Sequence, residues 1–163
     1  MYPKNIREMK SRTVIILIII IILFIAIQFV RPERNSETVI NRNELFAQLT
    51  DVPTVVRTSM LSACYNCHSN RTNYPWYASV APVSWMISNN IKSAKKKVNF
   101  SEWHVLSADK QHHNLMEIVE VLEEGSMPPT PYKLMHPPGN LNDVERGVIV
   151  EWVKSYSERI KGN

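Results

Sequence analysis

The chain has 163 residues, of which 44% are apolar and 21% are charged, with ten prolines, four glycines, two cysteines and a formal charge of +4. These values fit one modest globular domain with an additional segment, and two cysteines exclude a dense disulfide framework. A nucleic-acid binder is not expected, because residues 31–163 carry a net charge of only +1, and their densest basic cluster is Lys95, Lys96 and Lys97. We interpret this cluster as a solvated helix end, with a docking patch for an acidic partner as the alternative.

The additional segment is an apolar run near the N-terminus. Sixteen of the seventeen residues from Val14 to Val30 are apolar, and four basic side chains and one acidic side chain precede them. The run predicts an uncleaved single-pass transmembrane helix within residues 1–30, although its rise of about 25 Å is shorter than a hydrocarbon core of about 30 Å. The basic flank predicts a cytoplasmic N-terminus in the inner membrane and a C-terminal domain on the periplasmic side. A cleavable signal peptide is the alternative, and no small-residue cleavage site supports it.

Residues 31–43 are expected to be a polar linker, and residues 44–163 a helical domain. Apolar residues at helical spacing, together with proline and glycine at the boundaries, predict its elements. These are helices over about Pro53–Asn66, from Pro82 to about Val98, over Ser107–Gly125 and from Asn142 onward, turns over Ser69–Tyr77 and a proline-rich loop over Ser126–Gly139. No long segment alternates with a period of two, so we predict an all-α fold.

Three helix starts have recognisable capping residues. Asp51 is a suitable N-cap for the first helix, with a proline in the first turn, and Ser107 can cap the third. Asn142 followed three residues later by Glu145 predicts a capping box at the last helix. The faces expected to be buried are Val52, Val55, Val56 and Met60 in the first helix, Leu115, Ile118, Val119 and Leu122 in the third, and Val148, Ile149, Trp152 and Tyr156 in the last.

Cys64-Tyr65-Asn66-Cys67-His68 forms a C-x-x-C-H sequence, which is the pattern of covalent c-type haem attachment and uses both cysteines of the chain. Two thiols three residues apart at a helix end can reach the two vinyl groups of one porphyrin, and the adjacent histidine then lies beneath the iron. We therefore expect one covalently attached haem c per chain, bound to Cys64 and Cys67, with His68 as the proximal iron ligand.

Three other interpretations of the cysteines stay open. A thiol-disulfide oxidoreductase would also use C-x-x-C, but would place it at a helix N-terminus after a strand. A structural zinc site would need two further ligands; His112 and His113 are adjacent and lack the usual spacing, so His104 or His136 would have to complete it. The cysteines could also be buried and chemically idle.

Met127 is the expected distal iron ligand. It lies 59 residues after His68, in a loop stiffened by prolines that can hold a thioether against iron. Other methionines, namely Met60, Met86 and Met116, fall on expected helices and are better explained as core residues. The alternatives for the sixth position are Met135, His112, His113 and His136, of which His136 is the first candidate for a bis-histidine site.

Aromatic residues follow the motif closely, and a porphyrin needs a large apolar wall. We expect Tyr74, Trp76, Tyr77 and Trp85 to contribute to such a wall, with ordinary core packing as the alternative. Trp103 is a weaker candidate for the same wall.

Several segments in order resemble the bacterial haem-binding domain family over roughly residues 45–158. They are Cys64-Tyr65-Asn66-Cys67-His68-Ser69-Asn70, Tyr74-Pro75-Trp76-Tyr77, Ala81-Pro82-Val83-Ser84-Trp85, Asn99-Phe100-Ser101-Glu102-Trp103 and Met127-Pro128-Pro129. The resemblance implies a single N-terminal membrane segment followed by a cytochrome c-like helical haem domain. It also implies haem c on Cys64 and Cys67 with His68 as axial ligand. Small mono-haem cytochromes c commonly place a distal methionine in a loop before the C-terminal helix, which supports Met127.

These features predict a membrane-tethered mono-haem c-type cytochrome in the periplasm that passes single electrons between protein partners. Such a carrier transforms no substrate and is not an enzyme. Its expected partners are the lipid bilayer, unidentified redox proteins and the haem attachment machinery. One alternative is a haem sensor or peroxidase-like enzyme with an open or labile sixth position, and another is a haem with a structural or assembly role.

Overall fold

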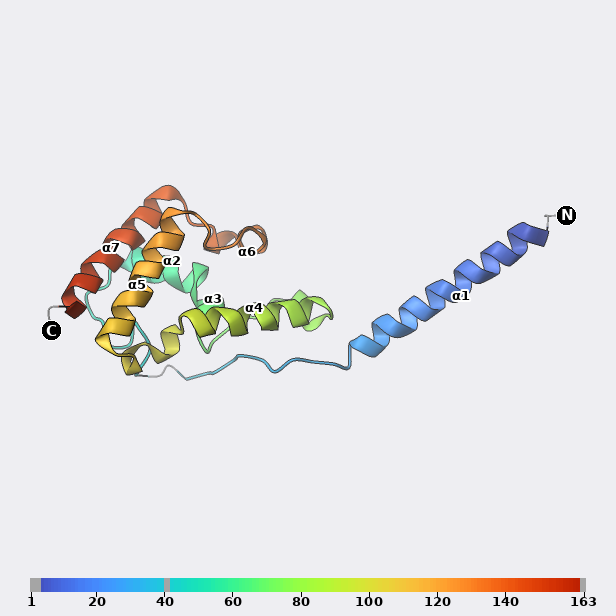
Figure 1. Cartoon of the computed structure of the whole chain (residues 1–163), viewed down its shortest axis with the longest axis horizontal. Helices are drawn as coiled ribbons and strands as arrows, with labels where there is room; N and C mark the ends of the chain where they lie inside the picture. The colour runs from blue at the N-terminus through green and yellow to red at the C-terminus, as the bar shows by residue number, and fades with distance from the viewer. Residues whose placement is uncertain (1–3, 40–41, 162–163) are drawn as a thin grey trace. The chain divides into compact units, whose positions relative to one another are not determined.

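The computed structural model describes the backbone of residues 4–39 and 42–161, and within these ranges the side chains from Ser11 onward. The described residues are mostly helical and contain no strand, only an isolated antiparallel bridge between Ser36 and Arg71 (Figure 1). The α-helices are α1 (Lys4–Ile27), α2 (Thr54–Ala63), α3 (Tyr65–His68), α4 (Val83–Lys97), α5 (Ala108–Glu123), α6 (Thr130–Met135) and α7 (Asp143–Lys161), and the 3₁₀ helices are η1 (Trp76–Ser79), η2 (Phe100–Val105) and η3 (Pro137–Gly139).

The prediction of an N-terminal transmembrane helix is wrong. Among the residues with described side chains, none of the helices combines the length and the apolar character needed to cross a membrane. The helical part of the apolar run stops at Ile27, so only fourteen of its residues, from Val14, belong to α1. These residues rise about 21 Å, whereas a helix that spans the hydrocarbon core must rise about 30 Å, which takes about 20 apolar residues. The predicted location, a single-pass inner-membrane protein with its haem domain in the periplasm, is contradicted for the same reason.

Parts of the predicted membrane orientation and of the predicted linker concern residues that the structure does not describe. Of the basic side chains used to orient the segment, only Arg12 is described; Lys4, Arg7 and Lys10 lie outside the described side chains. Two residues of the predicted linker, 40 and 41, also lie outside the described residues. The division of the chain at residues 30 and 43 into three parts stays a prediction.

The chain divides into two compact units, with a boundary inside α4. The smaller unit comprises residues 1–33 and 74–89. Within it, the Gln28 side chain accepts a hydrogen bond from the backbone N–H of Ala81 (2.9 Å) and donates one to its carbonyl (3.1 Å). The indole N–H of Trp85 donates to the carbonyl of Val30 (2.7 Å). These bonds connect the end of α1 to the start of α4.

The larger unit comprises residues 34–73 and 90–163 and contains the main core. α7 packs against both α5 and α2, as Figure 1 shows for the red and orange helices. The faces predicted for the last two helices are the observed ones: Leu115, Val119, Leu122, Ile149, Trp152 and Tyr156 are buried, and Ile118 and Val148 are half-buried. This core positions α2 and the segment that follows it.

Two of the three predicted caps are confirmed. The Ser107 hydroxyl accepts from the backbone N–H of Lys110. Asn142 and Glu145 form the reciprocal capping box, with side chain-to-backbone distances of 2.9 and 3.0 Å. The predicted cap at Asp51 is wrong because α2 begins later, with Pro53 at the N-cap position.

Two boundaries differ from expectation. The helix predicted over Pro53–Asn66 is interrupted, because Cys64 ends α2 and α3 starts at the next residue. The loop predicted over Ser126–Gly139 contains α6 and η3. Pro131 lies in the first turn of α6, where a missing N–H costs no helical hydrogen bond.

The core assignment predicts unequal effects for two neighbouring residues of α5. Leu115 is 1% exposed and Met116 is 36% exposed. Leu115→Ala should lower the free energy of unfolding by about 3 kcal/mol, because it leaves a cavity between α5 and α7. Met116→Ala, the matched control, should change it by less than about 0.5 kcal/mol. Urea unfolding followed by tryptophan fluorescence measures both, and equal effects would contradict the packing described here.

Candidate functional site

Both cysteines and His68 lie in one helical turn, the Cys64–His68 turn: Cys64 lies between α2 and α3, and Cys67 and His68 belong to α3. The backbone N–H groups of Cys67 (3.2 Å) and His68 (3.0 Å) both donate to the carbonyl of Cys64. This turn places Cys67 and His68 three and four residues after Cys64, so all three side chains lie on neighbouring positions of one helical face. Both thiols are free and half-buried. The structure thus brings together the three residues of the predicted haem attachment motif.

The imidazole of His68 is held in one tautomer. Its Nδ1 lies 3.1 Å from the carbonyl oxygen of Val98, and because a carbonyl only accepts, Nδ1 carries the proton. The lone pair is then on Nε2. Burial lowers the pKa of His68 below its ordinary value, which favours the neutral imidazole that binds metals. An imidazole and two unpaired thiols fit the donor set that haem c requires.

The thiol environment disfavours disulfide exchange. Burial, with a smaller contribution from Cys67, raises the pKa of the Cys64 thiol to about 12. Burial also raises the pKa of Cys67. Catalytic thiols of oxidoreductases have lowered pKa values, because the thiolate is the attacking species. The cysteines of this chain therefore lack the activation that the oxidoreductase interpretation needs.

The zinc interpretation finds no support in the described residues, where no group of three or more histidine, cysteine or acidic side chains is placed to hold a metal ion. The candidate histidines have other partners. His104 Nε2 lies 3.2 Å from the Leu45 carbonyl. His112 is bonded to the Ser157 hydroxyl, and His113 lies 3.7 Å from the carboxylate of Glu117.

Met127 lies on the loop between α5 and α6, and its side chain is 39% exposed. Its backbone is held from both sides: the N–H donates to the Val121 carbonyl (3.3 Å), and the carbonyl accepts from Arg146 (3.2 Å). Arg146 also donates to the carbonyl of Leu122 (3.0 Å). The loop backbone is thus fixed while the thioether lies outside the core, and ligation of iron by Met127 stays a prediction.

The aromatic residues predicted as a porphyrin wall fall into different places. Tyr74, Trp76, Tyr77 and Trp85 belong to the smaller unit, and their proposed role is untested. Trp103 is fully buried in the core of the larger unit, where its indole N–H donates to Tyr156 (3.2 Å).

The aromatic residues nearest to the motif were not singled out from the sequence. Tyr65 lies between the two cysteines and stacks on Phe46 and Phe100, with ring centroids 5.6 and 5.0 Å away. The ring of Phe100 is also 6.1 Å from that of His68. The position of Phe100 beside Asn99 and Ser101, within one of the family-like segments, was the available signal.

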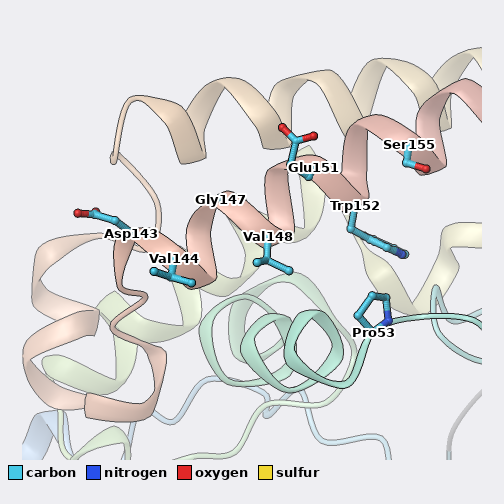
Figure 2. Close-up of a pocket in the computed structure, with 8 residues that line it drawn as sticks. All are labelled: Pro53, Asp143, Val144, Gly147, Val148, Glu151, Trp152 and Ser155. Atoms are coloured by element: carbon cyan, nitrogen blue, oxygen red, sulfur yellow. The ribbon is translucent and has the colours of Figure 1, made fainter.

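The larger unit has two hollows, one away from the motif and one beside it. A largely apolar groove of about 500 Å³ runs along α7 beside Pro53, with Trp152 at its base (Figure 2). Its lining contains neither a sulfur nor an imidazole, so it offers no iron ligand. A hollow of about 360 Å³ is bordered by Tyr65, Asn66 and Arg71.

The raised thiol pKa values predict slow alkylation of the folded, haem-free chain. Near pH 8.5 a free cysteine is about half ionised, whereas the thiolate fraction of Cys64 should be far smaller. Iodoacetamide should therefore modify Cys64 more slowly than it modifies the free thiol of glutathione. In urea, both cysteines should react at the ordinary rate. Mass spectrometry of digested protein at timed intervals measures each site. Alkylation of folded Cys64 at the rate of a free thiol would restore the oxidoreductase interpretation.

The comparison with known proteins gives a family and one partial relative. No solved structure is significantly similar to the chain. The chain is 30% identical over 93 residues to the cytochrome c peroxidase Ccp of Escherichia coli (strain K12); the matched part is 55% of this chain and only 20% of that relative. Residues 22–155 match the family described as a haem-binding domain, a stretch that includes the C-x-x-C-H motif and Met127. The chain therefore belongs to the haem-binding domain family.

Proposed function

We propose that this protein is a mono-haem c-type cytochrome that passes single electrons between protein partners. The observation that carries the proposal is the Cys64–His68 turn, where two unpaired thiols accompany an imidazole whose Nδ1–H donates to the Val98 carbonyl. Membership of a haem-binding family supports haem as the cofactor. Covalent attachment and the redox role are inferred from the chemistry of these side chains.

Each residue of the turn has a distinct task. Cys64 and Cys67 would each form one thioether bond to the porphyrin, and His68 would bind the iron through Nε2. The Val98 carbonyl orients the imidazole and raises its basicity through the Nδ1–H bond. When bound, haem supplies a one-electron couple between ferrous and ferric iron.

The residues around His68 keep water from its inner side. Phe100 is 1% exposed and Tyr65 is 4% exposed, and their rings stack with centroids 5.0 Å apart. An apolar environment disfavours the extra positive charge of ferric iron, so these rings would raise the reduction potential of a haem held by His68. A carrier with a raised potential accepts electrons readily from donors in its vicinity.

Met127 is the proposed distal ligand. Its backbone carbonyl accepts a hydrogen bond from Arg146, and its side chain is exposed and not packed in the core. Thioether ligation would fill the sixth position and leave no site for a small ligand, which suits electron transfer better than ligand chemistry.

A second candidate function is peroxidase-like chemistry at a labile sixth position. Two observations favour it: the similarity to a cytochrome c peroxidase over 93 residues, and the 39% exposure of Met127. A thioether held only from the surface can leave more easily than a buried one. In this case Met127 would be displaced before peroxide binds.

The attachment proposal is tested by co-expressing the full chain with a haem attachment machinery. The intact mass should exceed the polypeptide mass by one haem, and the haem should survive acidic organic extraction. Cys64→Ala and Cys67→Ala should each keep one thioether and shift the pyridine haemochrome band, and the double variant should lose covalent haem. A wild-type mass equal to that of the polypeptide, with free or disulfide-bonded cysteines, would refute the proposal.

The role of Met127 is tested by Met127→Ala, with Met135→Ala as the matched control from the same region. Met127→Ala should lose the weak red charge-transfer band of thioether-ligated ferric haem, and its ferrous form should bind carbon monoxide rapidly. Met135→Ala should match the wild type in both. If ferrous wild type binds carbon monoxide as fast as Met127→Ala, the sixth position is open and the peroxidase-like candidate replaces the carrier.

A further inference from the structure

Tyr132 connects the loop of the proposed distal ligand to the haem attachment motif. Its hydroxyl donates to the carbonyl of Ser62 (2.7 Å) and accepts from the side-chain amide of Asn66 (2.8 Å). Asn66 lies between the two cysteines. We infer that Tyr132 is a positioning residue that holds the Met127 loop against the motif and restrains the competing imidazole of His136. This inference rests on the proposed function.

The motif side of this contact is rigid. Asn66 uses its side-chain oxygen to accept from the backbone N–H of Asn73 (3.0 Å), and its carbonyl accepts from the Thr72 hydroxyl (2.7 Å). The amide is therefore oriented with its NH₂ group toward Tyr132. A hydroxyl bound to both Asn66 and Ser62 is fixed on the end of α2 and on the turn that carries the thiols.

On the other side of the contact, the Tyr132 hydroxyl attaches α6 to α2 and α3. No residue of α6 is buried, so the helix gains little from core packing. Three prolines, Pro128, Pro129 and Pro131, stiffen the four residues that separate Met127 from Tyr132. With Arg146 bound to the Met127 carbonyl at the other end, the segment is held at two points. Release of the Tyr132 hydroxyl would leave the Met127 end of the segment, which is held by Val121 and Arg146.

The same ring holds His136. The two rings stack with centroids 4.2 Å apart and an interplanar angle of 11°, and Nδ1 of His136 lies 3.2 Å from the carbonyl oxygen of Tyr132. The backbone N–H of His136 also donates to that carbonyl (2.9 Å). Tyr132 thus holds His136, the first alternative ligand, in a defined position and leaves the sixth position of the iron to Met127.

Gly139 gives independent evidence that the position of this ring is specified. A Cβ atom at Gly139 would lie 2.6 Å from Cε1 of Tyr132 and 3.0 Å from the backbone carbonyl oxygen of Ser62. Neither the stacked ring nor the helix backbone can withdraw freely, so only glycine allows the present approach. Gly139→Ala therefore displaces Tyr132 without removing any of its atoms.

The test uses the haem-loaded full chain at constant pH. Tyr132→Phe removes the two hydroxyl bonds and keeps the stack, and Tyr132→Leu removes both. Tyr156→Phe is the matched control, because it removes a tyrosine hydroxyl that is bonded to Trp103 instead. Tyr132→Phe should weaken the thioether charge-transfer band and raise the carbon monoxide association rate about tenfold, because the loop closes less favourably without the two hydroxyl hydrogen bonds. Tyr156→Phe should leave both at wild-type values, although it too loses thermal stability.

Tyr132→Leu should lose the band and acquire the electron paramagnetic resonance signals of bis-imidazole ferric haem. Adding His136→Ala should abolish these signals. Gly139→Ala should reproduce the Tyr132→Phe spectrum and serves as the second test if Tyr132→Leu does not fold. Wild-type spectra and rates in both Tyr132→Phe and Gly139→Ala would overturn the inference. A wild type with covalent haem but no thioether band would instead overturn the proposed role of Met127, so the two failures are distinguishable.

Discussion

The hydrogen bond from His68 Nδ1 to the Val98 carbonyl determines which nitrogen of the imidazole can meet a metal, and the site depends on it. The carbonyl is itself held in place by the residues that follow it. Asn99 donates to the Asn70 side chain (3.0 Å), and the backbone N–H of Asn70 donates to the Ser101 hydroxyl (2.9 Å). The segment after α4 is thus joined to the segment after the motif, and His68 is oriented from outside its own helix.

Burial around the motif is arranged in two layers. The rings of Phe46, Tyr65 and Phe100 form a continuous stack on the inner side of α3. Behind them, the carboxylate of Glu44, which is 3% exposed, binds the guanidinium of Arg71. A buried charge is costly unless it is paired, so this ion pair specifies how the segment before α2 meets the chain just after the motif.

The sequence predicted well the features that depend on a few neighbouring residues. The Ser107 cap and the Asn142 capping box are local, and each needs only a short spacing to be recognised. The apolar run failed as a predictor because hydropathy does not show that the helix stops at Ile27. α6 was missed because prolines usually mark loops, although Pro131 is compatible with a first turn.

The contacts that complete the site could not be predicted in this way. Val98 lies 30 residues from His68, and Tyr132 lies 66 residues from Asn66. Neither pair has a spacing rule, since tertiary folding alone brings the partners together.

The contacts of Asn66 determine whether the C-x-x-C-H motif can be transferred to another protein. The two positions between the cysteines look like spacers, yet the side chain and carbonyl of Asn66 engage partners both six to seven residues and 66 residues away. A pentapeptide grafted onto a foreign scaffold would carry the sulfur and nitrogen donors but leave this amide without its counterparts. A transplanted site would therefore have to include the segment through Asn73 together with α6, because the structural unit is larger than the pentapeptide.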